Sequence, residues 1–173
     1  MKKNFYLITL LFIGSIIYSC DSNDLEHQDE FETSNKVWLS FKQSNNNSYR
    51  YTTVNSSWIG ISQETTISVE NGIITQRDFK YTNIEGLPDD FPENELEWTE
   101  IGNQIGTHKN GAELLTLSEI YDKAQKKWLI ERKNATIYFK TDNNGMISTC
   151  GYVENNCADD CFIGIHIDNI ESL

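Results

Sequence analysis

The spacing of apolar residues predicts two helices at separate places in the chain. Residues 34–44 place Val37, Trp38 and Phe41 at intervals of three and four, which is the spacing of one helix face. Residues 116–133 repeat this spacing and open with a Thr-x-x-Glu sequence, which is typical of a capping box at a helix start. We therefore predict a helix over each of these two ranges.

Between and after these helices, apolar and polar residues alternate with a period of two, which predicts strands. Residues 65–70 and 73–81 are joined by Asn71-Gly72, a dipeptide typical of a type I′ hairpin turn because both residues accept a positive φ. The other alternating segments are residues 49–53, 97–105, 135–141, 146–152 and 162–167. This order predicts a single α+β domain, an antiparallel sheet of about six or seven strands packed by two helices.

The N-terminus carries an apolar segment of another kind. Residues 1–3 include two lysines and precede about a dozen apolar residues, as in a secretory signal, and this is shorter than the roughly 20 residues of a membrane span. The segment ends in Ile17-Tyr18-Ser19-Cys20, which resembles the lipobox of bacterial lipoproteins. The resemblance implies cleavage before Cys20 and a diacylglycerol group on its thiol. The alternative is an ordinary cleaved signal with an incidental cysteine.

These features divide the chain into a signal peptide over residues 1–19, an acidic tether over 20–33 and one domain over 34–173. In enterobacteria an aspartate in the place of Asp21 resembles an inner-membrane retention signal. In Bacteroidota lipoproteins an acidic stretch at this place resembles a surface-export signal, and the Asn-, Ile-, Lys- and Tyr-rich composition favours this second group. We expect a lipid-anchored protein at the outer membrane or cell surface, outside the cytoplasm.

The charge of the chain excludes one class of partner. Its 26 acidic and 14 basic residues give a formal net charge of −12, whereas a nucleic-acid-binding surface needs a basic patch. We expect no nucleic-acid partner, and contact with a membrane only through the N-terminal lipid.

Three cysteines follow near the C-terminus, namely Cys150, Cys157 and Cys161. An oxidising compartment favours a disulfide, which leaves one thiol over. If residues 146–152 and 161–167 form a hairpin, Cys150 and Cys161 lie opposite each other, and we predict that they pair. Cys157–Cys161 and Cys150–Cys157 remain open as alternatives. Zinc is disfavoured, because the C-x6-C-x3-C spacing differs from the usual zinc-binding patterns.

The remaining candidates concern catalysis and ligands. The sequence holds no nucleophile-elbow, metalloprotease or phosphate-loop motif, so we expect no enzyme activity, no cofactor and no metal. Residues 142–145 resemble the start of a calcium loop, but the glutamate expected at its twelfth position is missing, and a β-turn explains the segment. Trp58 and Trp98 are candidates for an exposed aromatic platform, with core packing as the alternative.

Several short motifs together are similar to a family of small secreted bacterial domains of unknown function. They are Trp38, Tyr49-x-Tyr51, and residues 68–72, 116–122 and 158–160. The resemblance covers about residues 36–170 and departs from the family pattern at residues 143–147. It implies a small helix-on-sheet fold without catalytic residues. We expect a binding or structural module for another protein; the alternative is a glycan-binding accessory lipoprotein of the cell surface.

Overall fold

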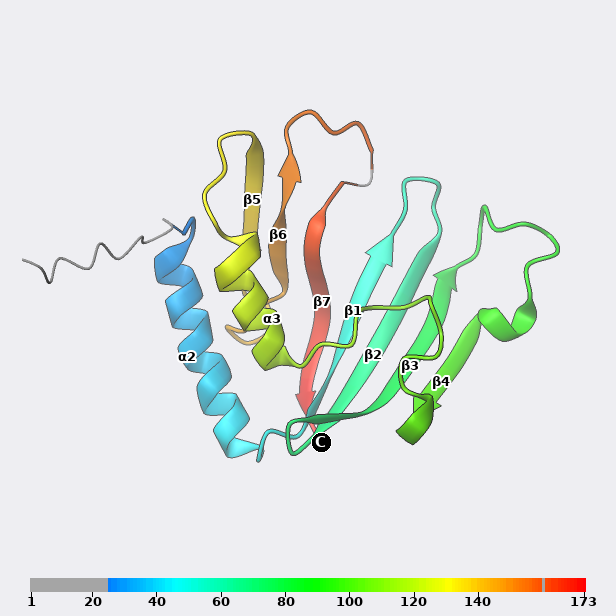
Figure 1. The fold of residues 1–173 in the computed structure, drawn as a ribbon, viewed down its shortest axis with the longest axis horizontal. Coiled ribbons are helices and arrows are strands. Elements are labelled where there is room, and N and C mark those ends of the chain that lie inside the picture. Colours follow the sequence, from blue (N-terminus) through cyan, green and yellow to red (C-terminus); the bar gives the residue numbers. More distant parts are fainter. Residues whose placement is uncertain (1–24, 160) are drawn as a thin grey trace, which may run out of the picture.

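The chain folds into a single α+β domain with one antiparallel seven-stranded sheet, which confirms the predicted fold class (Figure 1). The computed structural model describes residues 25–159 and 161–173, so the predicted signal peptide (1–19) and Cys20 lie outside the described residues. Helices α2 (Gln28–Ser44) and α3 (Leu117–Lys123) lie on one face of the sheet. None of the described helices is long and apolar enough to cross a bilayer.

The order of strands across the sheet is β4-β3-β2-β1-β7-β6-β5. The strands are β1 (Tyr49–Ser56), β2 (Ser62–Glu70), β3 (Ile73–Asn83), β4 (Glu97–Ile101), β5 (Ala135–Lys140), β6 (Thr149–Glu154) and β7 (Ile163–Ser172). The chain thus builds two halves, each a helix followed by an antiparallel meander. The pairing of β1 with β7 joins the halves into one sheet.

The predicted Asn71-Gly72 hairpin is confirmed. Glu70 and Ile73 face each other at the ends of β2 and β3, and Asn71 and Gly72 have φ angles of 50° and 83°. Two positive φ angles in a two-residue loop match the right-handed twist of the flanking strands. The hairpin therefore fixes which residues of β2 and β3 face the helices.

The core lies between the helices and the sheet, and aromatic side chains dominate it. Trp38 of α2 meets Tyr49 of β1 edge-to-face, with 5.2 Å between ring centroids, and stacks on Tyr121 of α3 at 6.0 Å. The Tyr49 hydroxyl accepts a hydrogen bond from the Leu117 backbone N–H at 2.9 Å, which satisfies one of the free donors at the start of α3. Helix packing and helix capping are thus tied to the same strand.

Helix α2 begins at Gln28, six residues before the predicted start. The prediction that residues 28–33 belong to the tether is wrong, because Phe31 is only 4% exposed and packs against the rings of Tyr121 and Phe139, at centroid distances of 6.0 and 6.2 Å. One apolar residue among acids gives no helical period in the sequence. Its burial depends on residues about 90 and 108 positions away, which local spacing does not reveal.

The second helix starts as predicted but ends earlier. The Thr116 hydroxyl accepts from the Glu119 N–H, and the Glu119 carboxylate accepts from the Thr116 N–H, so the capping box is formed. After Lys123 the helix widens into a π-helical turn, Ala124–Trp128, whose last hydrogen bond runs from the Leu129 N–H to the Ala124 carbonyl. The predicted continuation to Lys133 is wrong, because Ile130 instead pairs with Leu25 in a β-bridge.

We predict that Phe31→Ala lowers the free energy of unfolding by about 3–5 kcal/mol, because it removes a buried ring and leaves a cavity. Leu39→Ala is the matched control, since Leu39 lies on the same helix but is 52% exposed and should change stability by less than about 1 kcal/mol. Urea unfolding followed by circular dichroism measures both. Equal effects of the two substitutions would contradict the burial of residues 28–33 against the sheet.

Candidate functional site

The sheet splits where β1 and β7 stop pairing. Their register runs from Tyr49 opposite Ser172 to Thr53 opposite Ile167, with one extra residue, Asp168, bulged out of β7. Beyond this point β1 pairs only with β2, and β7 pairs only with β6. Within the described chain, residues 54–56 and 163–166 have no strand partner on the sides that face each other. The two strands diverge toward the top of Figure 1.

A groove of about 740 Å³ begins at this split and extends across β2 and β3, where Gln63, Thr65 and Tyr81 line it. Residues 53–57 and residues 164–166 all line it. A strand that turns one face toward a cavity contributes every second residue, since successive side chains point to opposite faces. Consecutive lining residues on both sides therefore show that the edges of β1 and β7 border the groove. We call this site the fork groove.

Apolar and uncharged polar side chains make up most of the fork groove. Its other lining residues are Ile59, Ile61, Gln63, Thr65, Tyr81, Leu87, Gly111, Ala112, Glu113, Leu115, Trp128 and Phe162. None of the described lining residues is Lys or Arg. Glu113 forms an ion pair with Lys123 of α3, and burial, with Lys140 nearby, lowers the pKa of His166. The groove is therefore close to uncharged at neutral pH.

Two facing glycines hold the upper part of β7 against β6. Gly151 and Gly164 lie opposite each other in the register, and a Cβ atom at Gly164 would lie 2.2 Å from the Cys150 carbonyl oxygen. Only glycine permits this close approach of the two backbones. The bulge at Asp168 bends the same strand, as an extra residue in an antiparallel pair does, at the point where β7 stops pairing with β1.

One wall of the fork groove belongs to the segment after β4, and a buried ion pair holds that segment in place. Arg77 of β3 and Glu100 of β4 are opposite each other in the register. The Arg77 Nε and Nη2 atoms donate to the two carboxylate oxygens of Glu100 at 2.9 and 3.0 Å. Both side chains are buried on the helix side of the sheet, and Glu100 has no exposed surface.

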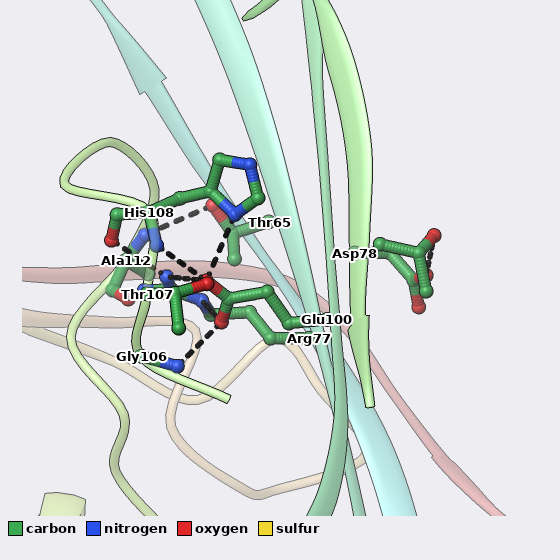
Figure 2. Close-up of polar contacts among 9 residues, drawn as sticks. Thr65, Arg77, Asp78, Glu100, Gly106, Thr107, His108 and Ala112 are labelled. Atoms are coloured by element: carbon green, nitrogen blue, oxygen red, sulfur yellow. Dashed lines mark hydrogen bonds and ion pairs between the residues drawn. The ribbon is translucent and has the colours of Figure 1, made fainter. Parts of the chain in front are cut away.

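Backbone groups of residues 106–112 complete the surroundings of this pair (Figure 2). The Glu100 carboxylate accepts from the N–H groups of Gly106 and His108, each at 2.6 Å. Arg77 donates to the carbonyls of His108 and Ala112 at 2.9 and 3.1 Å. Burial alone would raise the pKa of Glu100, but the hydrogen bonds from Arg77 and the backbone outweigh it and hold that pKa well below its usual range. The ion pair therefore fixes residues 106–112 to the sheet. We call Arg77, Glu100 and the residues packed against them the clamp.

The clamp positions the wall of the groove. The Ala112 N–H donates to the Thr65 hydroxyl at 3.0 Å, and Gly111 packs so tightly that a Cβ atom there would lie 3.3 Å from the Trp98 ring. Gly111, Ala112 and Glu113 are groove-lining residues. The fork groove thus depends on contacts that reach back to Arg77 and Glu100.

Trp98 belongs to this clamp, and its predicted role in an exposed aromatic platform is wrong. It is 8% exposed, and its ring stacks on His108 and Phe79 at centroid distances of 4.2 and 5.0 Å, with the Arg77 guanidinium 4.8 Å from its centroid. Trp58, the other predicted member, is 75% exposed in the β1–β2 turn. The two indoles therefore form no common surface, and the alternative of core packing holds for Trp98.

The predicted Cys150–Cys161 disulfide is also wrong. The structure joins Cys157 to Cys161, whose Cα atoms are 6.1 Å apart, and leaves Cys150 as a buried thiol. Cys150 lies opposite Ile165 in the β6–β7 register, whereas Cys161 precedes the first residue of β7. Burial raises the pKa of Cys150 to about 12, so this thiol stays protonated inside the core.

The face of the sheet opposite the helices is polar and carries a shallow hollow of about 360 Å³. The polar residues that line it are Arg50, Thr52, Glu64, Thr66, Asp78, Lys80, Glu97, Thr99 and Glu171. Its charges largely pair with each other, as in the Arg50–Glu171 and Lys80–Glu64 ion pairs. Such pairing is typical of a solvated sheet face.

Residues 142–145 form a turn, in which Asn144 has a φ of 52°. The Asn143 side-chain amide donates to the carbonyls of Ile147 and Ile167 at 2.9 and 3.0 Å, which ties the turn to β7. Among the described residues, no group of three or more His, Cys, Asp or Glu side chains is arranged to hold a metal ion.

Comparison of the chain with protein-family models, curated proteins and solved structures finds no match. The candidate site therefore stands on geometry. Sequence reasoning missed it because its edges are backbone atoms, and only the β1–β7 register reveals that they have no strand partner.

We predict that Glu100→Gln lowers the free energy of unfolding by about 3–5 kcal/mol at pH 7, because it leaves the Arg77 charge buried without its counterion. The folded-state pKa of Glu100 lies below its unfolded value of 4.5. Its ionisation therefore stabilises the fold fully above about pH 4.5, and this contribution is lost as the pH falls toward the folded-state pKa.

Denaturant unfolding between pH 3 and pH 8 measures the effect, and the variant should show a shallower loss of stability toward acid. Glu97→Gln is the matched control, since Glu97 lies exposed on the other face of the same strand. A Glu100→Gln protein as stable as the Glu97→Gln protein would contradict the proposed role of the clamp.

Proposed function

We propose that the protein is a lipid-anchored extracytoplasmic binding module whose fork groove contacts another protein. The observation that carries this proposal is the pair of strand edges that border the groove without a strand partner among the described residues. Backbone N–H and C=O groups at such edges are ready to pair with another chain. A second polypeptide supplies matching donors and acceptors, whereas most small ligands supply few.

The positions of the tryptophans favour a protein over a glycan. Aromatic platforms for sugars need ring faces in the open, and Trp98 is enclosed by His108 and Phe79. Trp128, the groove-lining indole, is 8% exposed. The open surface of Trp58 lies in the β1–β2 turn, outside the lining of the groove.

The electrostatics favour binding over catalysis. A catalytic carboxylate has a pKa matched to proton transfer and lies within reach of a substrate. The strongly perturbed carboxyl of the described chain, Glu100, is fully buried, and its pKa is lowered by structural hydrogen bonds. The groove itself contributes Glu113, already paired with Lys123, and His166.

The proposed anchor restricts how far the domain reaches from the membrane. Five residue steps separate Cys20 from Leu25, which pairs with Ile130 in the folded domain. Five extended residues span at most about 18 Å. A lipidated Cys20 therefore holds the end of the domain that carries Leu25 close to the bilayer, which favours partners at the same membrane.

We predict that the full chain, expressed in a bacterium with lipoprotein processing, takes up an alkyne analogue of palmitate and sediments with membranes, and that Cys20→Ser abolishes both properties. The control is the double variant Cys157→Ser/Cys161→Ser, which removes two cysteines of the domain but keeps Cys20. Click labelling of the gel band and fractionation give the readouts. Labelling that persists in Cys20→Ser protein would remove the anchor from the proposal.

We predict that a photo-crosslinking benzoylphenylalanine at Asn55, an exposed groove residue, gives a discrete protein adduct in cells that produce the lipoprotein natively. The control position is Asn169, which is exposed on β7 opposite Thr52. Gel shift and mass spectrometry identify the adduct. An adduct at neither position, or one that a glycosidase removes, would contradict protein binding through the groove.

A further inference from the structure

We propose that the fork groove takes up an extended segment of another protein as an added strand between β1 and β7. This inference rests on the proposed function and specifies its mode of recognition. In this mode the partner contributes main-chain hydrogen bonds, which do not depend on its sequence. The walls of the groove contact every second side chain of the partner and so determine specificity.

The facing edges of the split are three and four residues long. Residues 54–56 of β1 and residues 163–166 of β7 are the facing edges, so the added strand gains pairs along about three or four residues. β1 and β7 are antiparallel to each other. The added strand must therefore run antiparallel to one edge and parallel to the other, an arrangement found in mixed sheets.

The volume and the lining also fit a peptide. A groove of about 740 Å³ lies within the range of about 300–1,000 Å³ that is usual for ligand clefts. On the helix side, the added strand would face Leu115 and Trp128, which line the groove beneath the split. Since successive side chains of a strand alternate between faces, every second residue of the segment should be apolar.

The charge distribution favours basic residues at the end of the segment that lies toward residues 84–95. The chain carries a formal charge of −12, and no described lining residue of the groove is Lys or Arg. The residues 84–95, which supply Leu87 to the lining, hold five acids and no base. The five acids are Glu85, Asp89, Asp90, Glu93 and Glu95. Lys123 pairs with Glu113 and Lys126 pairs with Asp122, while Lys140 lies near His166 on the β7 side of the groove.

The occupant we infer is therefore an extended peptide segment with apolar residues at alternate positions and Lys or Arg at one end. The test is selection from a random library of displayed 12-residue peptides on the Cys20→Ser protein. Enriched peptides should show this pattern. Synthetic copies should lose at least tenfold in affinity when two alternate backbone nitrogens of the apolar stretch are methylated, because methylation removes donors and keeps the side chains.

Asn55→Trp fills the groove at an exposed position and should abolish binding of these peptides in fluorescence polarisation. Asn169→Trp is the matched control and should bind with unchanged affinity. Circular dichroism and the unfolding midpoint show whether each variant is folded; if Asn55→Trp is not, Ser56→Trp serves as the second groove-filling variant.

Four results would overturn the inferred occupant or its mode of binding. They are the absence of enriched peptides, enrichment of acidic peptides, affinities that N-methylation leaves unchanged, and a dimer of the protein that Asn55→Trp dissociates, since the occupant would then be a second copy. Any of these results, together with a protein adduct at Asn55 in cells, would contradict only this inference and leave the proposed binding of a protein in place. Loss of the adduct as well would remove both.

Discussion

The pairing of β1 with β7 is the contact on which the rest of the structure depends. Each half of the chain is a helix followed by a meander, and this one ladder joins the two into a seven-stranded sheet. It also places β1 beneath the helices. Tyr49 contacts Trp38 of α2 and Leu117 of α3, and the Tyr51 hydroxyl donates to the Leu115 carbonyl just before α3. Where the ladder ends, after Thr53, the sheet opens and the fork groove begins.

The buried Arg77–Glu100 ion pair positions one wall of the fork groove, although burying two charges costs free energy. Removing two charges from water costs several kcal/mol per ion, which the attraction between them offsets only when the remaining donors and acceptors are satisfied. Here backbone groups of residues 106–112 satisfy them. These hydrogen bonds fix the course of residues 106–112, a segment without regular structure. The wall of the groove is therefore held in one position.

Local signals in the sequence predicted the elements that depend on neighbouring residues. The Asn71-Gly72 turn and the Thr116–Glu119 capping box form as expected, because both are decided within four residues. The predictions that were wrong share one cause, which is that contacts and strand registers outside the local sequence decide them. Phe31 joins a helix because distant rings cover it. Cys161 does not meet Cys150 because the β6–β7 register places Ile165, four residues after Cys161, opposite Cys150.

The sequence by itself determined the α+β class, because helical and strand periods are written into consecutive side chains. It also determined the acidic charge of the surface. Only the tertiary structure decided that Trp98 is enclosed, that Glu100 is a buried counterion and that the sheet splits between β1 and β7. These features arise from registers and contacts between residues far apart in the chain, and a backbone edge without a partner leaves no trace in the side chains that carry it.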